Sequence, residues 1–256
     1  MELMGVWRYP VKSLQGEPLD EARLEGDGLL GDRRWGIRDL RTGRILTARR
    51  RPELLTAAGT YDGEQPVVTI PDGRTVVGPG KGTDDLLSEW LGSPVSLVPS
   101  VGSSAGRAEF FADATDDTSR AIEWTMPVGR YVDAAPVLLL TTASLRTAAA
   151  LHPNGVWDPR RFRPNLLVDL EGEGWVEDQW VDQPLRVGTA TLLPTEPCSR
   201  CTMVTRPQPG LGADVDVFRT LARHHRGLFG VWSDVVTPGT VRVGDRAALA
   251  RIRSPR

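Results

Sequence analysis

The chain has 256 residues, of which 40% are hydrophobic and 25% are charged, and its formal net charge is −2. These values are typical of a soluble globular protein with one large or two small domains, and the small net charge argues against a nucleic-acid binder that depends on bulk electrostatics. No stretch approaches the roughly 18 apolar residues of a membrane-spanning helix. The start, MELMGVWRYPVKS, lacks a basic segment followed by an apolar run, so we expect no signal peptide, no membrane contact and a cytoplasmic location.

Short β-branched or alternating stretches, separated by Gly, Pro or Asp, predict strands along most of the chain. Within one of them, PDGRT predicts a hairpin turn because Pro presets φ and Gly accepts a positive φ. The predicted strand regions are VWRYPV (6–11), WGIRDL (35–40), PVVTIPDGRTVVG (66–78), SPVSLVP (93–99), APVLLLTT (135–142), PNLLVDL (164–170) and TVRVGDRAALARI (240–252).

Three stretches predict helices: 83–92, 141–152 and 216–227. The first has a Thr/Asp start and a Gly stop, the second is rich in Ala and Leu behind a Thr cap, and the third ends in basic residues and Gly. Many strands with few helices favour a β-rich α+β fold with a β-barrel core and a few peripheral helices, instead of a doubly wound sheet.

The stretch PSVGSSAGRA (99–108) is the best linker candidate because small and flexible residues dominate it. It predicts a smaller N-terminal β domain over residues 1–98 and a larger C-terminal domain over residues 109–250. No internal repeat is present.

Arginine dominates the basic residues: Lys12 and Lys81 are the only lysines among 31 Lys and Arg. With abundant Ala, Gly and Pro, this bias indicates genome composition more than selection at individual sites. An arginine is therefore a site candidate only where its setting singles it out.

The only two cysteines, Cys198 and Cys201, lie three positions apart in EPCSRCTMVT (196–205). A structural zinc site would need two more ligands, and the adjacent His224 and His225 would point about 100° apart on a helix. A thioredoxin-like dithiol belongs to a βαβ pattern that is absent here. Two interpretations of the cysteine pair stay open on these grounds. Both cysteines are buried without a chemical role, or one of them is the ligand of a soft metal and the other is its neighbour.

Several segments resemble MOSC proteins, the family that includes the mitochondrial amidoxime reducing component and its bacterial relatives. YPVKSLQGEPL (9–19) and GLLGDRRWGIRDLRTGRILTARRRPEL (28–54) resemble the MOSC N-terminal barrel domain. RFRPNLLVD (161–169), EDQW (177–180), PCSRC (197–201) and FGVWSDVVTPGTVRVGD (229–245) resemble the MOSC domain. The resemblance covers nearly the whole chain in the expected order, and it implies a MOSC-type β-barrel.

The resemblance implies a molybdenum cofactor, a molybdopterin with a mono-oxo molybdenum centre, and a reductase of N-hydroxylated compounds. It makes Cys201 the metal ligand and catalytic residue, and Cys198 a small buried side chain. A thiolate suits this metal, and the positive charge of Arg200 favours the thiolate. The other cofactor contacts implied by the resemblance are Lys12, Ser13, Arg33, Asp133, Arg163, Asn165, Ser199 and Arg200. Guanidinium groups offer bidentate hydrogen bonds to phosphate, and an asparagine amide both donates and accepts.

Arg34 falls where the family tolerates other residues. The cluster from Arg44 to Arg51 is expected to form a solvated basic face, and Arg160 and Arg161 are expected at the surface. Two departures from the family pattern stand out. Leu14 replaces a common cysteine, and RPQPGLG (206–212) replaces an acidic residue and a T-G turn near the expected substrate mouth.

With no further cysteines to hold an iron–sulfur cluster, we expect electrons from a separate flavin or iron–sulfur reductase and a small-molecule substrate. Two alternatives are a carrier of molybdenum cofactor or sulfur without turnover, and a degenerate barrel without cofactor. The intact set of site residues argues against the last.

Overall fold

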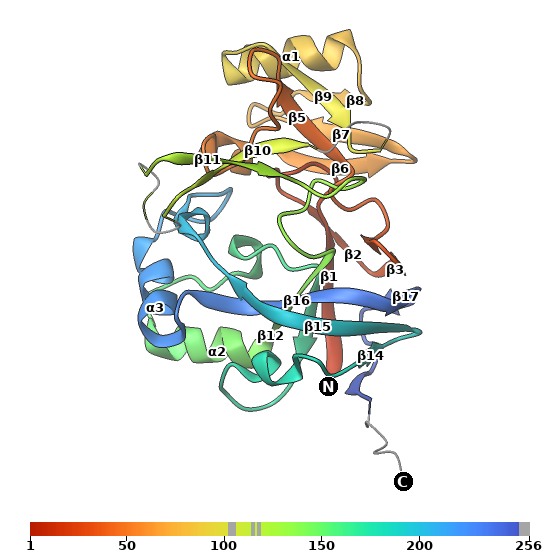
Figure 1. Cartoon of the computed structure of the whole chain (residues 1–256), viewed down its shortest axis with the longest axis vertical. Helices are drawn as coiled ribbons and strands as arrows, with labels where there is room; N and C mark the ends of the chain where they lie inside the picture. Colours follow the sequence, from red (N-terminus) through yellow and green to blue (C-terminus); the bar gives the residue numbers. More distant parts are fainter. Residues whose placement is uncertain (102–105, 114–115, 117–118, 251–256) are drawn as a thin grey trace.

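An eight-stranded sheet dominates the computed structural model, which describes residues 1–101, 106–113, 116 and 119–250 (Figure 1). The strand order is β18-β14-β15-β16-β12-β13-β1-β2, and among the described residues of this sheet β12 and β13 are the parallel pair of strands. The bounds are β1 Glu2–Arg8, β2 Glu17–Leu19, β12 Val137–Thr141, β13 Leu166–Asp169, β14 Leu185–Val187, β15 Ala190–Ser199, β16 Leu228–Thr237 and β18 Ala247–Leu249.

Four smaller sheets accompany it among the described residues. The hairpin predicted at PDGRT is confirmed: Gly73 has a φ of 90°, and its N–H donates to the Ile70 carbonyl at 2.9 Å. The sheets are β17 (Gly239–Arg242) with β3 (Glu21–Glu25) and β4 (Gly28–Leu29); β5 (Trp35–Asp39) with β9 (Val95–Pro99); β6 (Ala58–Asp62) with β7 (Gln65–Thr69) and β8 (Thr75–Val77); and β10 (Arg107–Phe111) with β11 (Ala121–Thr125).

The three predicted helices are confirmed as α1 (Lys81–Leu91), α2 (Thr142–Leu151) and α3 (Val215–His225). Helix α1 ends at Gly92 in the left-handed conformation, and the Thr141 hydroxyl caps α2 by accepting from the Ser144 N–H at 3.1 Å. Short 3-10 helices span Pro52–Thr56, Pro159–Arg161, Val176–Trp180 and Thr202–Thr205. The prediction of a strand-rich fold with few helices is confirmed.

The two longest strands, β15 and β16, were not predicted from residue pattern. Strand β15 contains Pro194 and Pro197, and its pairing with β16 shifts register near both. Proline cannot donate to a sheet and weakens the strand signal of a segment. Strand β15 nevertheless carries the chain to Ser199, directly before Arg200 and Cys201.

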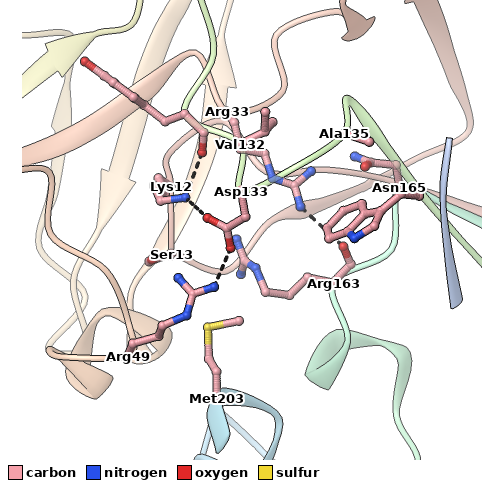
Figure 2. Close-up of a pocket in the computed structure, with 12 residues that line it drawn as sticks. Lys12, Ser13, Arg33, Arg49, Val132, Asp133, Ala135, Arg163, Asn165 and Met203 are labelled. Atoms are coloured by element: carbon pink, nitrogen blue, oxygen red, sulfur yellow. Dashed lines mark hydrogen bonds and ion pairs between the residues drawn. The ribbon is translucent and has the colours of Figure 1, made fainter. Parts of the chain in front are cut away.

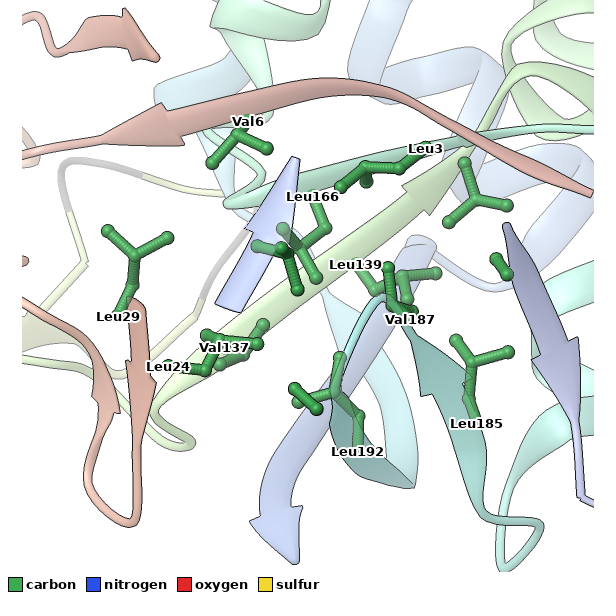
Figure 3. Packing of buried hydrophobic residues seen from close by; sticks show 14 of the residues in the cluster. Leu3, Val6, Leu24, Leu29, Val137, Leu139, Leu166, Leu185, Val187 and Leu192 are labelled. Atoms are coloured by element: carbon green, nitrogen blue, oxygen red, sulfur yellow. The ribbon is translucent and has the colours of Figure 1, made fainter. Parts of the chain in front are cut away.

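The main hydrophobic core takes residues from both halves of the chain (Figure 3). Leu3 and Val6 on β1, with Leu24 and Leu29, pack against C-terminal side chains that include Val137, Leu139, Leu166, Leu185, Val187 and Leu192. A second core lies within the N-terminal half and includes Val11, Leu14, Ile37, Leu54, Leu55, Val68, Leu87, Val95 and Leu97. Strands β1, β3 and β4 of the N-terminal half therefore pack with the C-terminal half, whereas Val11 and Leu14 between them belong to the second core.

The division into domains 1–98 and 109–250 stays a prediction. Strand β1 pairs with β13, and β3 pairs with β17, so a fragment that starts at residue 109 would lack two pairing partners. Residues 102–105 of the predicted linker lie outside the described part of the chain. Experiments on the site below therefore use the full chain.

Candidate functional site

A pocket between the two halves of the chain collects most of the predicted site residues (Figure 2). Loops supply nearly all of its lining, from both sides of the predicted linker. The N-terminal half gives Lys12, Ser13, Arg33 and Arg49, and the C-terminal half gives Tyr131, Val132, Asp133, Ala135, Arg163, Asn165, Met203 and Trp232.

Three lining residues have a backbone conformation that non-glycine residues rarely adopt. Ser13, Arg33 and Arg163 have φ values of 70°, 49° and 57°, and they are three of the five such non-glycine residues in the described ranges. Each costs on the order of 1–2 kcal/mol relative to ordinary backbone. Strained residues that gather at one pocket indicate that the local chain course serves a site.

Lys12 and Asp133 form the centre of the pocket. The buried Lys12 Nζ donates to the Tyr131 carbonyl at 3.0 Å and to Asp133 Oδ1 at 2.5 Å, and Arg49 Nη2 donates to Asp133 Oδ2 at 2.7 Å. Burial lowers the pKa of Lys12, with partial compensation from Asp133. Burial would raise the pKa of Asp133, but Arg49 and Lys12 hold it well below its usual range.

Arg49 corrects the expectation that the arginines from 44 to 51 are all solvated. Its side chain is only 11% exposed, and its guanidinium lies 3.9 Å from the centroid of the Phe110 ring. Burial would lower the pKa of Arg49, but Asp133 and the adjacent Cys201 sulfur raise it overall. Arg49 therefore connects the pocket to the cysteine.

The neighbours of Arg49 point elsewhere because the chain turns at this point. The Thr47 carbonyl accepts N–H groups from both Arg50 and Arg51. Arg50 is 41% exposed and donates to Glu109 at 3.0 Å, and Arg51 donates to the Leu91 carbonyl at 2.6 Å. Sequence alone gives no signal that separates Arg49 from these two.

Arg33 and Arg163 meet at Tyr9. Their guanidinium carbons lie 4.4 and 4.3 Å from the centroid of the Tyr9 ring, and Arg33 forms an ion pair with the fully buried Asp32. Burial, followed by the nearby Arg33, lowers the pKa of Arg163 to about 10. Burial raises the pKa of Tyr9 to about 12, and its hydroxyl has no hydrogen-bond partner among the described residues.

The pocket thus has excess positive charge. Four cationic side chains, Lys12, Arg33, Arg49 and Arg163, face only two carboxyl groups, Asp32 and Asp133. Four positive and two negative charges leave an excess of two positive charges, because Lys12 and Arg49 share Asp133 and Arg163 forms no ion pair with either carboxyl group. Since buried charge is costly without a counter-charge, this arrangement suits a ligand with a doubly charged anionic group.

The other predicted contact residues mostly form hydrogen bonds with backbone groups of the protein. Ser13 Oγ accepts from the Ala48 N–H at 3.0 Å, and the Asn165 amide bonds to the Trp7 carbonyl and the Leu138 N–H. Arg200 donates to the carbonyls of Phe229 at 3.0 Å and Phe162 at 3.1 Å. Ser199 is exposed at the end of β15, and neither it nor Arg200 is among the lining residues above.

The two cysteines differ in setting. Cys198 is fully buried on β15, and burial raises the pKa of its thiol to about 11. Cys201 is partly exposed, precedes the 3-10 helix Thr202–Thr205, and lies beside Arg49. Cys201 is thus the more accessible thiol, at the edge of the cationic pocket.

Two of the three histidines have partners away from the pocket. His225 is stacked on Trp175 and contacts Asp178 at 2.7 Å and the Leu228 carbonyl at 2.9 Å, and His152 contacts Asp214 at 3.2 Å. No group of three or more His, Cys, Asp or Glu placed to hold a metal ion occurs in the described ranges.

Arg161 is a second correction, since we expected it at the surface with Arg160. It is 1% exposed and donates to the carbonyls of Gly212 at 2.7 Å, Val156 at 2.9 Å, Val204 at 3.3 Å and Arg206 at 3.4 Å. Arg160 is 41% exposed and pairs with Asp158, as expected of a surface residue. Arg161 therefore fixes the loop 206–212, where the chain departs from the family pattern.

We expect Arg161→Met to lower the free energy of unfolding by about 3 kcal/mol, because carbonyls are left without donors in a buried place. Arg160→Met, at an exposed ion pair, should cost less than about 1 kcal/mol. Urea unfolding of both full-length variants measures this difference. Equal losses would show that the contacts of Arg161 contribute no more than a surface pair.

Both halves of the chain match known protein-family models. The family model for the MOSC N-terminal beta barrel domain matches residues 1–92, and the model for the MOSC domain matches residues 128–248. The chain is 26% identical to human mitochondrial amidoxime-reducing component 1 over 95% of this chain and 81% of that protein.

A second relative is the molybdenum cofactor sulfurase of rice (Oryza sativa subsp. japonica), 25% identical over 81% of this chain and 28% of that protein. The crystal structure of the YUAD protein from Bacillus subtilis aligns over 96% of this chain and 93% of that one, with 12% identity and a TM-score of 0.48. Among the described residues, no helix has the length and apolar character to cross a membrane.

Proposed function

The chain belongs to the MOSC domain family, with a MOSC N-terminal beta barrel domain before the MOSC domain, and on this premise we propose that it is a molybdenum-cofactor-dependent oxidoreductase. We propose the two-electron reduction of N-hydroxylated compounds, with electrons from a separate redox protein. One observation carries the proposal: a pocket with two more positive than negative side chains lies beside a partly exposed cysteine.

The residues present fit this cofactor. A pterin dithiolene that ends in a phosphate needs cationic and hydrogen-bonding groups, and a thiophilic metal needs a sulfur ligand. Lys12, Arg33 and Arg163 would bind the anionic end, and Cys201 would bind the metal. The further contacts in this proposal are Ser13, Asp133, Asn165, Ser199 and Arg200.

The bound cofactor supplies the two-electron chemistry that converts a hydroxylamine, amidoxime or oxime-type N–OH substrate, with two protons, to the reduced nitrogen compound and water. The protein's residues bind and orient. Arg163 is fixed by its bond to the Leu14 carbonyl at 2.6 Å, and Arg33 by its ion pair with Asp32. Such fixed cations bind an anion without reorganisation at the moment of binding.

Turnover separates this proposal from a carrier of cofactor or sulfur, which the match to a molybdenum cofactor sulfurase favours as a second candidate. Purified full-length protein is incubated with benzamidoxime and a chemical electron donor, and benzamidine is measured. An enzyme forms benzamidine catalytically. A carrier binds cofactor and forms none, and that outcome would refute the reductase.

Lys12 gives the pocket a pH dependence. A protonated lysine attracts an anion, and burial lowers its pKa below the ordinary 10.5, so affinity for inorganic pyrophosphate should fall as pH rises from neutral toward 10.5. In Lys12→Arg the cation persists, so the fall should begin at higher pH. Calorimetric titration of both proteins measures the two profiles. Superimposable profiles would show that Lys12 does not face the anion.

A further inference from the structure

The hairpin of β10 and β11 presents an apolar face that is only partly covered. Directly paired residues of an antiparallel hairpin share a face. The pairs Phe110–Ile122 and Ala108–Trp124 lie on one face, and the acidic pair Glu109–Glu123 between them lies on the other. Ala108 packs against Ile45, Met126 and Tyr131 in a small core. Ile122 and Trp124, by contrast, are 42% and 46% exposed, although both are large hydrophobic residues.

This face adjoins the candidate site through Phe110. The Phe110 ring lies 3.9 Å from the Arg49 guanidinium and 5.9 Å, centroid to centroid, from the Trp124 ring. Arg49 contacts Asp133 in the pocket and lies beside Cys201. An uninterrupted series of contacts therefore leads from the thiol to an exposed aromatic ring.

Ion pairs fix the hairpin in place. Glu109 and Glu123 face each other across the strands on the opposite face, where like charges would repel. Arg44 contacts both carboxylates, and Arg50 contacts Glu109 at 3.0 Å. In Figure 1 the hairpin crosses the middle of the molecule, between the α1 end and the large sheet. The ion pairs on one face of the hairpin thus hold its apolar face in a fixed position.

We propose that Phe110, Ile122 and Trp124, here named the hairpin platform, bind the aromatic ring of the substrate and make aryl N-hydroxylated compounds the preferred class. This inference rests on the proposed function. Two aromatic rings offer tilted or stacked contact to a third flat ring, and Ile122 adds apolar area. The N–OH end of the substrate would then lie toward Arg49 and Cys201.

Binding of two probes to the full-length protein tests the platform. Benzamidoxime has a phenyl ring, and acetamidoxime has a methyl group in its place, so their N–OH ends match. Dissociation constants are measured by ligand-detected NMR, without any need for turnover. Trp124→Ala should weaken benzamidoxime binding about tenfold and change acetamidoxime binding less than about twofold.

Two further variants are matched controls. Trp124→Phe keeps an aromatic ring and should retain most of the affinity for benzamidoxime. Val128→Ala shortens a side chain that is 77% exposed just beyond β11, and it should change neither constant. Thermal unfolding of each variant confirms that the exposed positions leave the fold intact.

Several results would overturn the platform: no binding of benzamidoxime to the wild type, an equal loss for both probes, or no change in Trp124→Ala. Unchanged probe binding together with slower reduction by a protein donor, but not by a chemical donor, would instead assign the surface to a redox partner. Probe selectivity without any turnover would support the platform while refuting the proposed reductase.

Discussion

Replacing Cys201 by serine is expected to abolish reduction of benzamidoxime, at least a thousandfold below the wild type. A hydroxyl is a harder and far less acidic ligand than a thiol, so the metal would lose its anionic sulfur. Cys201 is also the only partly exposed thiol of the chain, since the other is buried. Turnover with a chemical electron donor measures the loss without dependence on a partner protein.

Cys198→Ser is the control for that variant. Cys198 is fully buried in β15, where a hydroxyl costs about 1–3 kcal/mol of stability, and it is not among the residues that line the pocket. We expect most activity to persist below the unfolding temperature of this variant. If both single variants lost activity equally, the roles assigned to the two cysteines would be wrong.

Lys12→Ala and Arg33→Ala are each expected to lower the cofactor content of the purified protein. Both side chains are nearly buried cations at one pocket, and a charge-assisted hydrogen bond to phosphate contributes about 1.5–3 kcal/mol. Each loss should therefore weaken binding by about one to two orders of magnitude. Pterin content, measured by fluorescence after oxidation, reports the change.

Arg50→Ala is the matched control because Arg50 is one residue from Arg49 yet 41% exposed and paired with Glu109. Its cofactor content should equal that of the wild type. Equal losses in all three variants would mean that general surface charge, and not the pocket between the two halves, governs binding.

Local pattern predicted the three helices and, at least in part, nine of the eighteen strands in the described residues. Each of the three helices has a recognisable cap or stop, and the predicted strands have alternating or β-branched residues. Pattern failed at β15, where two prolines interrupt the signal. The pairing of β1 with β13 joins residues more than 150 positions apart, and no local rule predicts such a contact.

The site was only partly predictable for a related reason. Lys12 was distinctive because lysine is rare here, and the family resemblance pointed to Arg33 and Arg163. Arg49 and Arg161 stand in runs of arginines whose members are alike in sequence. Only the turn at Thr47 and the carbonyls around Arg161 distinguish the buried arginine from its exposed neighbours.

Molybdenum analysis of the full-length protein, purified from a host supplied with molybdate, tests the central claim most directly. The claim is that a pocket built by both halves of the chain binds a molybdenum cofactor with Cys201 as the metal ligand. We predict stoichiometric molybdenum in the wild type and a loss of the metal in Cys201→Ser. Wild-type protein that is folded but contains neither molybdenum nor pterin would contradict the claim.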